Sequence, residues 1–278
     1  MNLPDKAFFC IAVTVYGIGM MYSFFLWRKG FRRDDWVVYS LLGCGLIFHT
    51  IAMVQRGFSI NQCPINNLYE AIVFIMWTIV AGFLVVGLWA RLRFLGAFAS
   101  PLLFLMGVFA LMNFQSLPNM ESVNVEEKNF SVALGSLHKT LLLLSFGAFG
   151  LSAVAAAMFL TQQHDLKSHR FRAILSMLPP LQRLEQTMTR LICVGFGMLT
   201  LGLVASSAYH FQPGTTLSAG DPMVIWMLGV WVFYSVLLFL HWRQAQSGKR
   251  FAWGALGSFL FMMLTFWGAM LSHLQRTT

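Results

Sequence analysis

Apolar stretches of about 20 residues recur along the whole chain, and this feature limits its fold more than any other. A helix needs about 20 apolar residues to cross the hydrocarbon core of a bilayer. Only 10% of the 278 residues are charged and 58% are apolar, whereas soluble domains contain about 25% charged residues. These values exclude a soluble globular protein and a disordered one. The sequence therefore predicts an all-α, polytopic membrane protein with one integral membrane domain over residues 1–278.

The apolar stretches predict eight membrane-spanning helices. Their expected bounds are 7–27, 36–54, 68–89, 94–114, 136–160, 190–210, 224–242 and 251–273. Of the 19 Lys and Arg residues, 14 fall in the connections after the first, third, fifth and seventh helices, and 5 fall on the other side. The positive-inside rule then predicts that both termini face outward. The N-terminal sequence lacks the basic region and cleavage site of a signal peptide, so we expect the first helix to be retained.

The positive charge and the cysteines exclude several other classes. The net charge is +9, but the aromatic residues lie mostly inside the apolar stretches instead of alternating with a basic patch, so no nucleic-acid partner is expected. The four cysteines form neither a CxxC nor a CxxCH motif. The chain is therefore neither a thioredoxin-like protein nor itself a c-type haem acceptor. Its expected surroundings are a lipid bilayer.

Histidines are the main polar candidates for function. Four of them, on four different predicted helices, gather toward the expected outer face: His49, His138, His210 and His273. A further one, His241, lies at the opposite end of the seventh helix. Neutral imidazole is a common metal ligand and a usual axial ligand of haem. Zinc normally takes carboxylate or thiolate partners as well, and few lie nearby, so two histidines holding a haem fit better. For each histidine, the alternative is an interfacial anchor or a hydrogen-bonded core residue.

Glu70 is the one acidic residue inside a predicted span. The spacing of Asn67 and Glu70 resembles a capping box, in which the glutamate serves the first turn of the helix. Direct contact of Glu70 with a ligand or partner is the alternative. Small residues such as Gly147 and Gly150 on the fifth helix, and Gly195 and Gly202 on the sixth, indicate close helix packing.

Five stretches, in this order along the chain, match a known family pattern. They are CPINNLYEAIVFIMW (63–77), LHKTLLLLSFGAFGLS (137–152), LPPLQRLEQTMTRLICVGFGMLTLGL (178–203), DPMVIWMLGVW (221–231) and WGAMLSHLQ (267–275). Together they resemble the cytochrome c assembly family, which contains the CcsA-type haem-handling membrane proteins and their shorter HemX-like relatives. The resemblance covers residues from about 46 to 273.

The resemblance implies roles for particular histidines. By position, His138 and His273 are similar to two outer histidines that flank a Trp-rich loop and ligate haem iron. His241 resembles a further histidine at the inner end of the helix after that loop. The family pattern also implies haem b as the cofactor, thioether formation on the outer side, and a bacterial plasma membrane. Its implied partners are a second membrane protein of cytochrome c biogenesis and apocytochrome c.

The loop itself departs from the family pattern. The family pattern there is W-G-x-Y-W-x-W-D-P, whereas this chain has GTTLSAGDP (214–222). Asp221 and Pro222 remain, with Trp226 shortly downstream, but the aromatic platform for haem is missing. This departure favours an accessory or HemX-like member over a full synthase. His210 stands just before the loop, and the hypothesis is that it compensates as a ligand.

Three functional hypotheses follow. The first is a membrane protein that binds or delivers haem during c-type cytochrome biogenesis. The second is a HemX-like, non-enzymatic regulator or scaffold of tetrapyrrole metabolism. The third, a transporter of a metal or small solute, has the least support because no inverted repeat is visible. No independent nucleophile–base pair is visible either, so enzymatic activity stays open.

Overall fold

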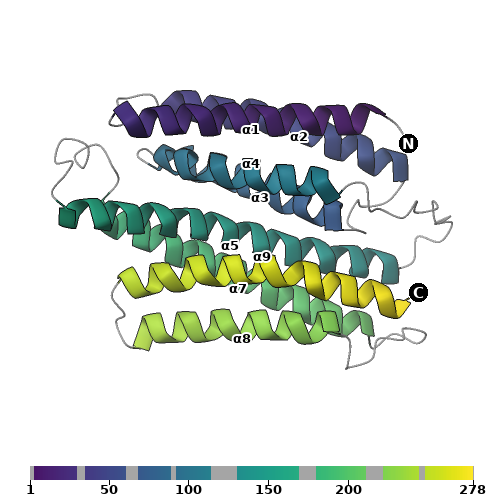
Figure 1. The fold of residues 1–278 in the computed structure, drawn as a ribbon. Helices are drawn as coiled ribbons and strands as arrows, with labels where there is room; N and C mark the ends of the chain where they lie inside the picture. Colours follow the sequence, from purple (N-terminus) through teal and green to yellow (C-terminus); the bar gives the residue numbers. More distant parts are fainter. Residues whose placement is uncertain are drawn as a thin grey trace.

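A computed structural model of the chain consists of long α-helices that lie side by side (Figure 1). It describes residues 3–29, 35–60, 68–88, 92–113, 130–168, 180–210, 222–243 and 248–277. The helices are α1 (Leu3–Lys29), α2 (Asp35–Ile60), α3 (Leu68–Leu88), the short η1 (Arg93–Leu95), α4 (Gly96–Asn113), α5 (Phe130–Ser168), α7 (Leu181–His210), α8 (Pro222–Arg243) and α9 (Gly248–Thr277).

Within the described residues, seven segments are long and apolar enough to cross a membrane. They lie on α1, α2, α3, η1 with α4, α5, α7 and α8. The eighth expected span corresponds to α9. No strand occurs within these described ranges. The prediction of an all-α, polytopic membrane protein is therefore confirmed.

Two helices extend well beyond their predicted bounds, because helical structure continues past the apolar residues. The expected fifth span, 136–160, lies within α5, which runs to Ser168. The next helix begins at Leu181, nine residues before the predicted start at 190. Its added turns bury Leu184 and Met188 at a spacing of four residues, and so they pack one face against the bundle.

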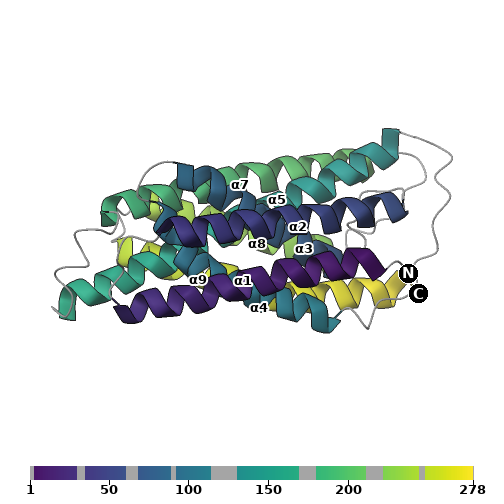
Figure 2. The ribbon, with the colours of Figure 1, turned by 90° about the horizontal axis from the view of Figure 1, so that it is seen from above.

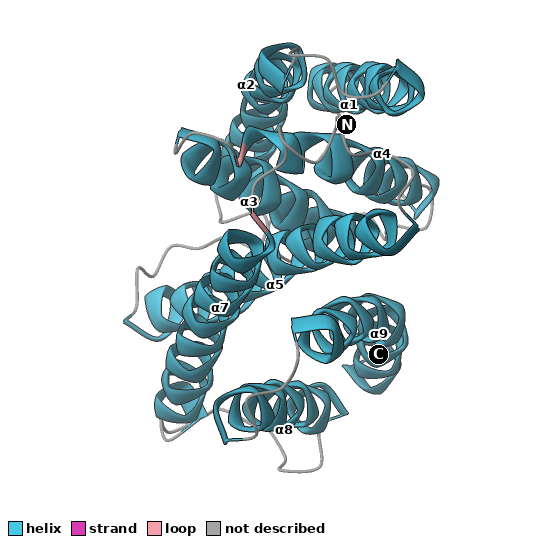
Figure 3. Ribbon diagram, turned by 90° about the vertical axis from the view of Figure 1, so that its left-hand side faces the viewer, coloured by secondary structure: helices cyan, strands magenta, loops and turns pink. Residues whose placement is uncertain are grey.

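The helices alternate in direction, so α1 begins and α9 ends at the same end of the bundle (Figure 1). We call this the terminal end, and we call the other, where α8 is followed by α9, the basic end. Seen from above, the helices stay close to parallel over their length (Figure 2). In the end view, α5 lies in the middle, with α1 to α4 on one side and α7, α8 and α9 on the other (Figure 3).

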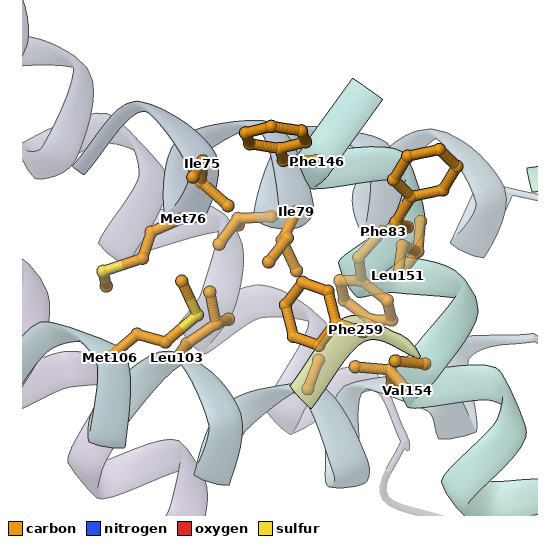
Figure 4. Close-up of a cluster of buried hydrophobic side chains, with 14 of the residues drawn as sticks. Ile75, Met76, Ile79, Phe83, Leu103, Met106, Phe146, Leu151, Val154 and Phe259 are labelled. Atoms are coloured by element: carbon orange, nitrogen blue, oxygen red, sulfur yellow. The ribbon is translucent and has the colours of Figure 1, made fainter. Parts of the chain in front are cut away.

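Glycines on α5 and α7 let the helices approach closely, as the sequence predicted. A Cβ on Gly150 would lie 2.7 Å from Ile79 Cδ1 of α3 and 3.0 Å from Phe259 of α9. A Cβ on Gly202 would lie 3.0 Å from Leu142 of α5. Figure 4 shows Ile79 and Phe259 within the buried apolar cluster of α3, α4, α5 and α9. The absent side chains are therefore a packing requirement.

A larger side chain at Gly150 is expected to destabilise this cluster. Gly150→Leu forces its side chain against Ile79 and Phe259, and overpacking of this kind costs about 1–3 kcal/mol. Gly257→Leu is the matched control, because a Cβ there meets no atom within 4 Å. The apparent melting temperature in detergent should fall for Gly150→Leu and stay near the parent value for Gly257→Leu. Equal melting temperatures would show that α3, α5 and α9 are not packed as described.

Candidate functional site

His138 is held by a hydrogen bond between helices. It lies in the first turns of α5, and its Nδ1 is 2.7 Å from the carbonyl oxygen of Gly202 on α7. Because a carbonyl only accepts, Nδ1 carries the hydrogen and donates it. The lone pair of the neutral imidazole is then on Nε2. Histidines that bind metals usually have this arrangement, in which one ring nitrogen donates to a carbonyl and the other coordinates the metal.

An aromatic layer lies deeper in the bundle than His138. This aromatic layer consists of Phe146 of α5, Trp226 of α8 and Phe266 of α9. Its ring centroids are 5.8 Å apart for Phe146 and Trp226, 5.9 Å for Phe146 and Phe266, and 5.5 Å for Trp226 and Phe266. The indole Nε1 of Trp226 donates to Thr265 Oγ1 at 2.9 Å. The candidate residue Trp226 is therefore a fixed part of the helix packing.

The aromatic layer shows that His138 and His273 lie at the same height. His138 precedes Phe146 by eight residues on α5, and residue 273 follows Phe266 by seven residues on the antiparallel α9. At 1.5 Å per residue, both positions are about 10–12 Å nearer the terminal end than the layer. The side chain of His273 lies outside the described part of the structure.

The other residues near the loop lie further out. His210 follows Gly202, the partner of His138, by eight residues along α7, and so its backbone is about 12 Å closer to the terminal end. Its side chain, like residue Asp221 as a whole, lies outside the described residues.

His49 lies in a different part of the bundle. It is fully buried on α2, where its Nδ1 is 3.2 Å from the hydroxyl of Tyr16 and its ring contacts that of Phe9, both on α1. Its Nε2 has no hydrogen-bond partner among the described residues. In the end view, α2 and α9 lie on opposite sides of α5 (Figure 3). The structure thus places His49 against α1, on the other side of α5 from α9, which carries His273.

His241 lies near the basic end. Its Nε2 is 3.4 Å from Thr189 Oγ1 of α7, and its ring stacks on Phe251 of α9 with centroids 4.0 Å apart. The described residues contain no group of three or more His, Cys, Asp or Glu side chains that would hold a metal ion.

The sequence interpretation missed the partner of Glu70. This carboxylate is buried, with 3% of its surface exposed, and its Oε1 lies 3.1 Å from Nε of Arg56 on α2. Arg56 lies near the end of α2 and Glu70 in the first turn of α3. Opposite charges on both sides of a short connection between antiparallel helices were the signal that would have predicted the pair.

Loss of the Trp226 hydrogen bond is expected to weaken the packing of α8 on α9. Thr265→Val leaves the indole N–H without its partner in an apolar setting, and interhelical hydrogen bonds of this kind are worth about 1 kcal/mol. Thr161→Val is the control, because the hydroxyl of Thr161 is exposed and bonds the carbonyl of Ala157 in its own helix. The melting temperature should fall more for Thr265→Val. Equal shifts would contradict the role of this bond.

Fold and site together define a multi-pass helical membrane protein with imidazole groups between its helices. Residues 65–274 match the family described as cytochrome C assembly protein. Because the match covers most of the chain, the protein belongs to the cytochrome c assembly family, as the five stretches predicted.

Named relatives fall into two groups. The chain is 25% identical to "Cytochrome c biogenesis protein CcsA" of Trieres chinensis, over 93% of this chain and 91% of the relative. It is 22% identical to a protein of the same name from Guillardia theta, over 93% and 88% of the two chains. It is also 24% identical to "Protein HemX" of Bacillus subtilis (strain 168), over 91% of both chains.

Proposed function

We propose that the protein binds haem and delivers it during the biogenesis of c-type cytochromes, with His138 and His273 as axial ligands of the iron. The observation that carries this proposal is the 2.7 Å hydrogen bond from His138 Nδ1 to the Gly202 carbonyl. It fixes the ring and makes Nε2 the nitrogen that carries the lone pair, as in histidines that bind metals. Membership of the cytochrome c assembly family supports haem as the ligand.

The common height of residues 138 and 273 supports their pairing. Two imidazoles on adjacent helices are able to approach an iron from opposite faces of a porphyrin. The aromatic layer then forms an apolar floor beneath the macrocycle, with Trp226 held in place by Thr265. We assign His210 and Asp221, on the two sides of the loop at 211–221, to contacts at the haem edge. His210 would compensate for the tryptophans that this loop lacks, and Asp221 is retained from the family pattern.

The two remaining histidines belong to other levels in this proposal. We assign His241 to a second haem contact near the basic end, where it already stacks on Phe251. His49, whose Nε2 is unpartnered among the described residues, is a third candidate contact in the α1–α2–α3 part of the bundle.

The proposed setting follows from the charge pattern and the family. We place the protein in the bacterial plasma membrane with the terminal end on the outer side, because 14 of 19 Lys and Arg residues fall on the basic side. Haem b, a second biogenesis protein in the membrane and apocytochrome c are its proposed partners. Bound iron supplies the redox-active centre, and the chemistry of attachment belongs largely to haem and the acceptor cysteines.

The direct test is an absorption spectrum of the purified protein in mild detergent, oxidised and dithionite-reduced, with haem measured as the pyridine haemochrome. We expect a Soret band and close to one haem per chain from haem-replete cells. A haem-free spectrum from such cells would contradict the proposal.

A second function has its own supporting observation. The loop GTTLSAGDP (214–222) contains no tryptophan, and the HemX relative matches over 91% of both chains. The second proposal is therefore a non-enzymatic, HemX-like regulator or scaffold of tetrapyrrole metabolism. It requires no stoichiometric haem and a protein partner at the basic end. Affinity purification of cross-linked membranes, compared between the parent and a variant with the basic residues of 161–189 neutralised, distinguishes the two functions.

A further inference from the structure

Four polar atoms inside the unit of α5, α7, α8 and α9 have no hydrogen-bond partner among the described residues. They are Ser152 Oγ, Gln162 Nε2, Tyr234 OH and His241 Nδ1. Leaving a buried polar group unpaired is costly, and inside a membrane the surrounding lipid offers no substitute. In native proteins, most buried polar groups bond either to protein or to ordered water. These four groups therefore need a partner other than the described side chains.

Two of the four groups lie in the middle of the unit. The ring of Tyr234 stacks on that of Phe149 of α5, with centroids 3.7 Å apart and planes 8° from parallel. Gly195 of α7 makes room for this stack, because a Cβ there would lie 2.7 Å from the Phe149 ring. Ser152 follows Phe149 by three residues, about one turn toward the basic end. Both Tyr234 and Ser152 are 1% exposed.

The other two groups lie closer to the basic end. His241 is seven residues beyond Tyr234 on α8. It therefore lies on nearly the same helix face and about 10 Å closer to the basic end. Gln162 follows Phe159 by one turn of α5. The Phe159 ring lies beside Gly248 at the start of α9, one turn before the Phe251 ring on which His241 stacks. Gln162 thus lies closest to the basic end, and His241 lies about two helical turns further in, between Gln162 and Tyr234.

The aromatic layer lies on the terminal side of Tyr234 and Ser152. Phe146, Trp226 and Phe266 come from three of the four helices and contact one another. The polar atom of Trp226 is already bonded to Thr265. The layer therefore separates the four unpaired groups from the level of His138.

We propose that α5, α7, α8 and α9 enclose a one-sided water path. It enters at His241 and Gln162, at the basic end, and stops at Tyr234 and Ser152 beneath the aromatic layer. Water is the ligand, because buried waters bind where several polar atoms converge and make about three hydrogen bonds each. The path gives the phenol of Tyr234 access to solvent from one side of the membrane only. This inference does not depend on haem binding at His138 and His273.

Two serines on α5 provide a matched test. Ser145 and Ser152 are both buried and, seven residues apart, lie on nearly the same helix face. They differ in that Ser145 Oγ donates to the Leu142 carbonyl, whereas Ser152 Oγ has no partner among the described residues. Each is changed to cysteine in a full-length chain whose native cysteines are replaced by alanine: Cys10, Cys44, Cys63 and Cys193.

The expected result is a difference in thiol reactivity. In nanodiscs, Ser152→Cys should react with a small methanethiosulfonate at least about tenfold faster than Ser145→Cys, because a thiol in a dry apolar core stays protonated and unreactive. In sealed vesicles, a membrane-impermeant reagent should reach Ser152→Cys from the basic side only. Equal rates for the two variants, or labelling from the terminal side, would overturn the proposal.

A second measurement needs no substitution. Hydroxyl radicals made from bound water by an X-ray pulse oxidise side chains next to that water, and mass spectrometry locates them. Tyr234 and Tyr16 are equally buried, but the Tyr16 hydroxyl is bonded to His49. We expect oxidation of Tyr234 to exceed that of Tyr16 clearly. Oxidation of Tyr234 no greater than that of Tyr16 would overturn the water path even if the cysteine variants failed to fold.

Discussion

The double substitution His138→Ala/His273→Ala is expected to abolish haem binding while leaving the fold intact. Both proposed axial ligands are then lost, and neither the aromatic layer nor the contacts assigned to the haem edge replace them. Changing a group that only supports a metal ligand already lowers metal affinity by about 10–100-fold, so losing two direct ligands has a larger effect. The measurement is the haem-to-protein ratio from the pyridine haemochrome, with the Soret band compared between variant and parent.

The haem experiment has controls on the same chain. His164→Ala removes an exposed histidine of α5, and its haem content should equal that of the parent. His210→Ala tests the assignment of that residue to the haem edge, and a partial loss is expected. Undiminished haem in the double variant would remove His138 and His273 from the ligand set. A parent protein free of haem would instead shift support to the HemX-like function.

Arg56→Leu is expected to destabilise the protein by about 3 kcal/mol, because breaking a buried ion pair leaves an uncompensated charge in an apolar setting. Glu70 is 3% exposed, whereas Arg56 is 21% exposed. Removing the arginine therefore strands the more deeply buried member of the pair. Glu70→Leu should cost less, since the long arginine side chain is able to turn its charge toward the headgroups. Thermal unfolding followed by circular dichroism in one detergent measures both variants.

The double variant Arg56→Leu/Glu70→Leu is the control for this pair. It removes both charges, and replacing a buried ion pair by apolar residues is often close to neutral. Its melting temperature should therefore recover toward that of the parent. If Arg56→Leu and Glu70→Leu lowered the melting temperature equally and the double variant added both losses, the pair would not be coupled.

Several parts of the fold were predictable because they depend on the local pattern of the chain. The eight apolar stretches correspond to α1 to α5 and α7 to α9, since only a helix pairs its own backbone groups inside a membrane. The close approach at Gly150 followed from small residues on a long apolar helix. The helix ends were less predictable. In α7, the amphipathic residues 181–189 extend the helix without adding to its apolar length.

The candidate site was only partly predictable. The family pattern selected His138 as a candidate, but the hydrogen bond that orients it comes from a backbone carbonyl of α7, 64 residues away. A carbonyl group carries no sequence signal. The capping interpretation of Glu70 did not predict Arg56, because a cap depends on neighbouring residues and this ion pair joins two helices. The sequence placed four histidines toward the same end of the bundle. It did not show that one of them, His49, faces α1.

The sequence by itself determined that this chain is a multi-pass helical membrane protein of the cytochrome c assembly family. Apolar length is a property of consecutive residues, and an apolar stretch inside a bilayer must form a helix to pair its backbone groups. Charge asymmetry between the connections can also be counted along the chain, and it indicates the orientation of those helices. Only the tertiary structure decided which polar groups meet, because contacts between helices depend on the rotation and depth of each one. Two results of that packing are the pairing of Tyr16 with His49 and the Tyr234 hydroxyl, which has no partner among the described residues.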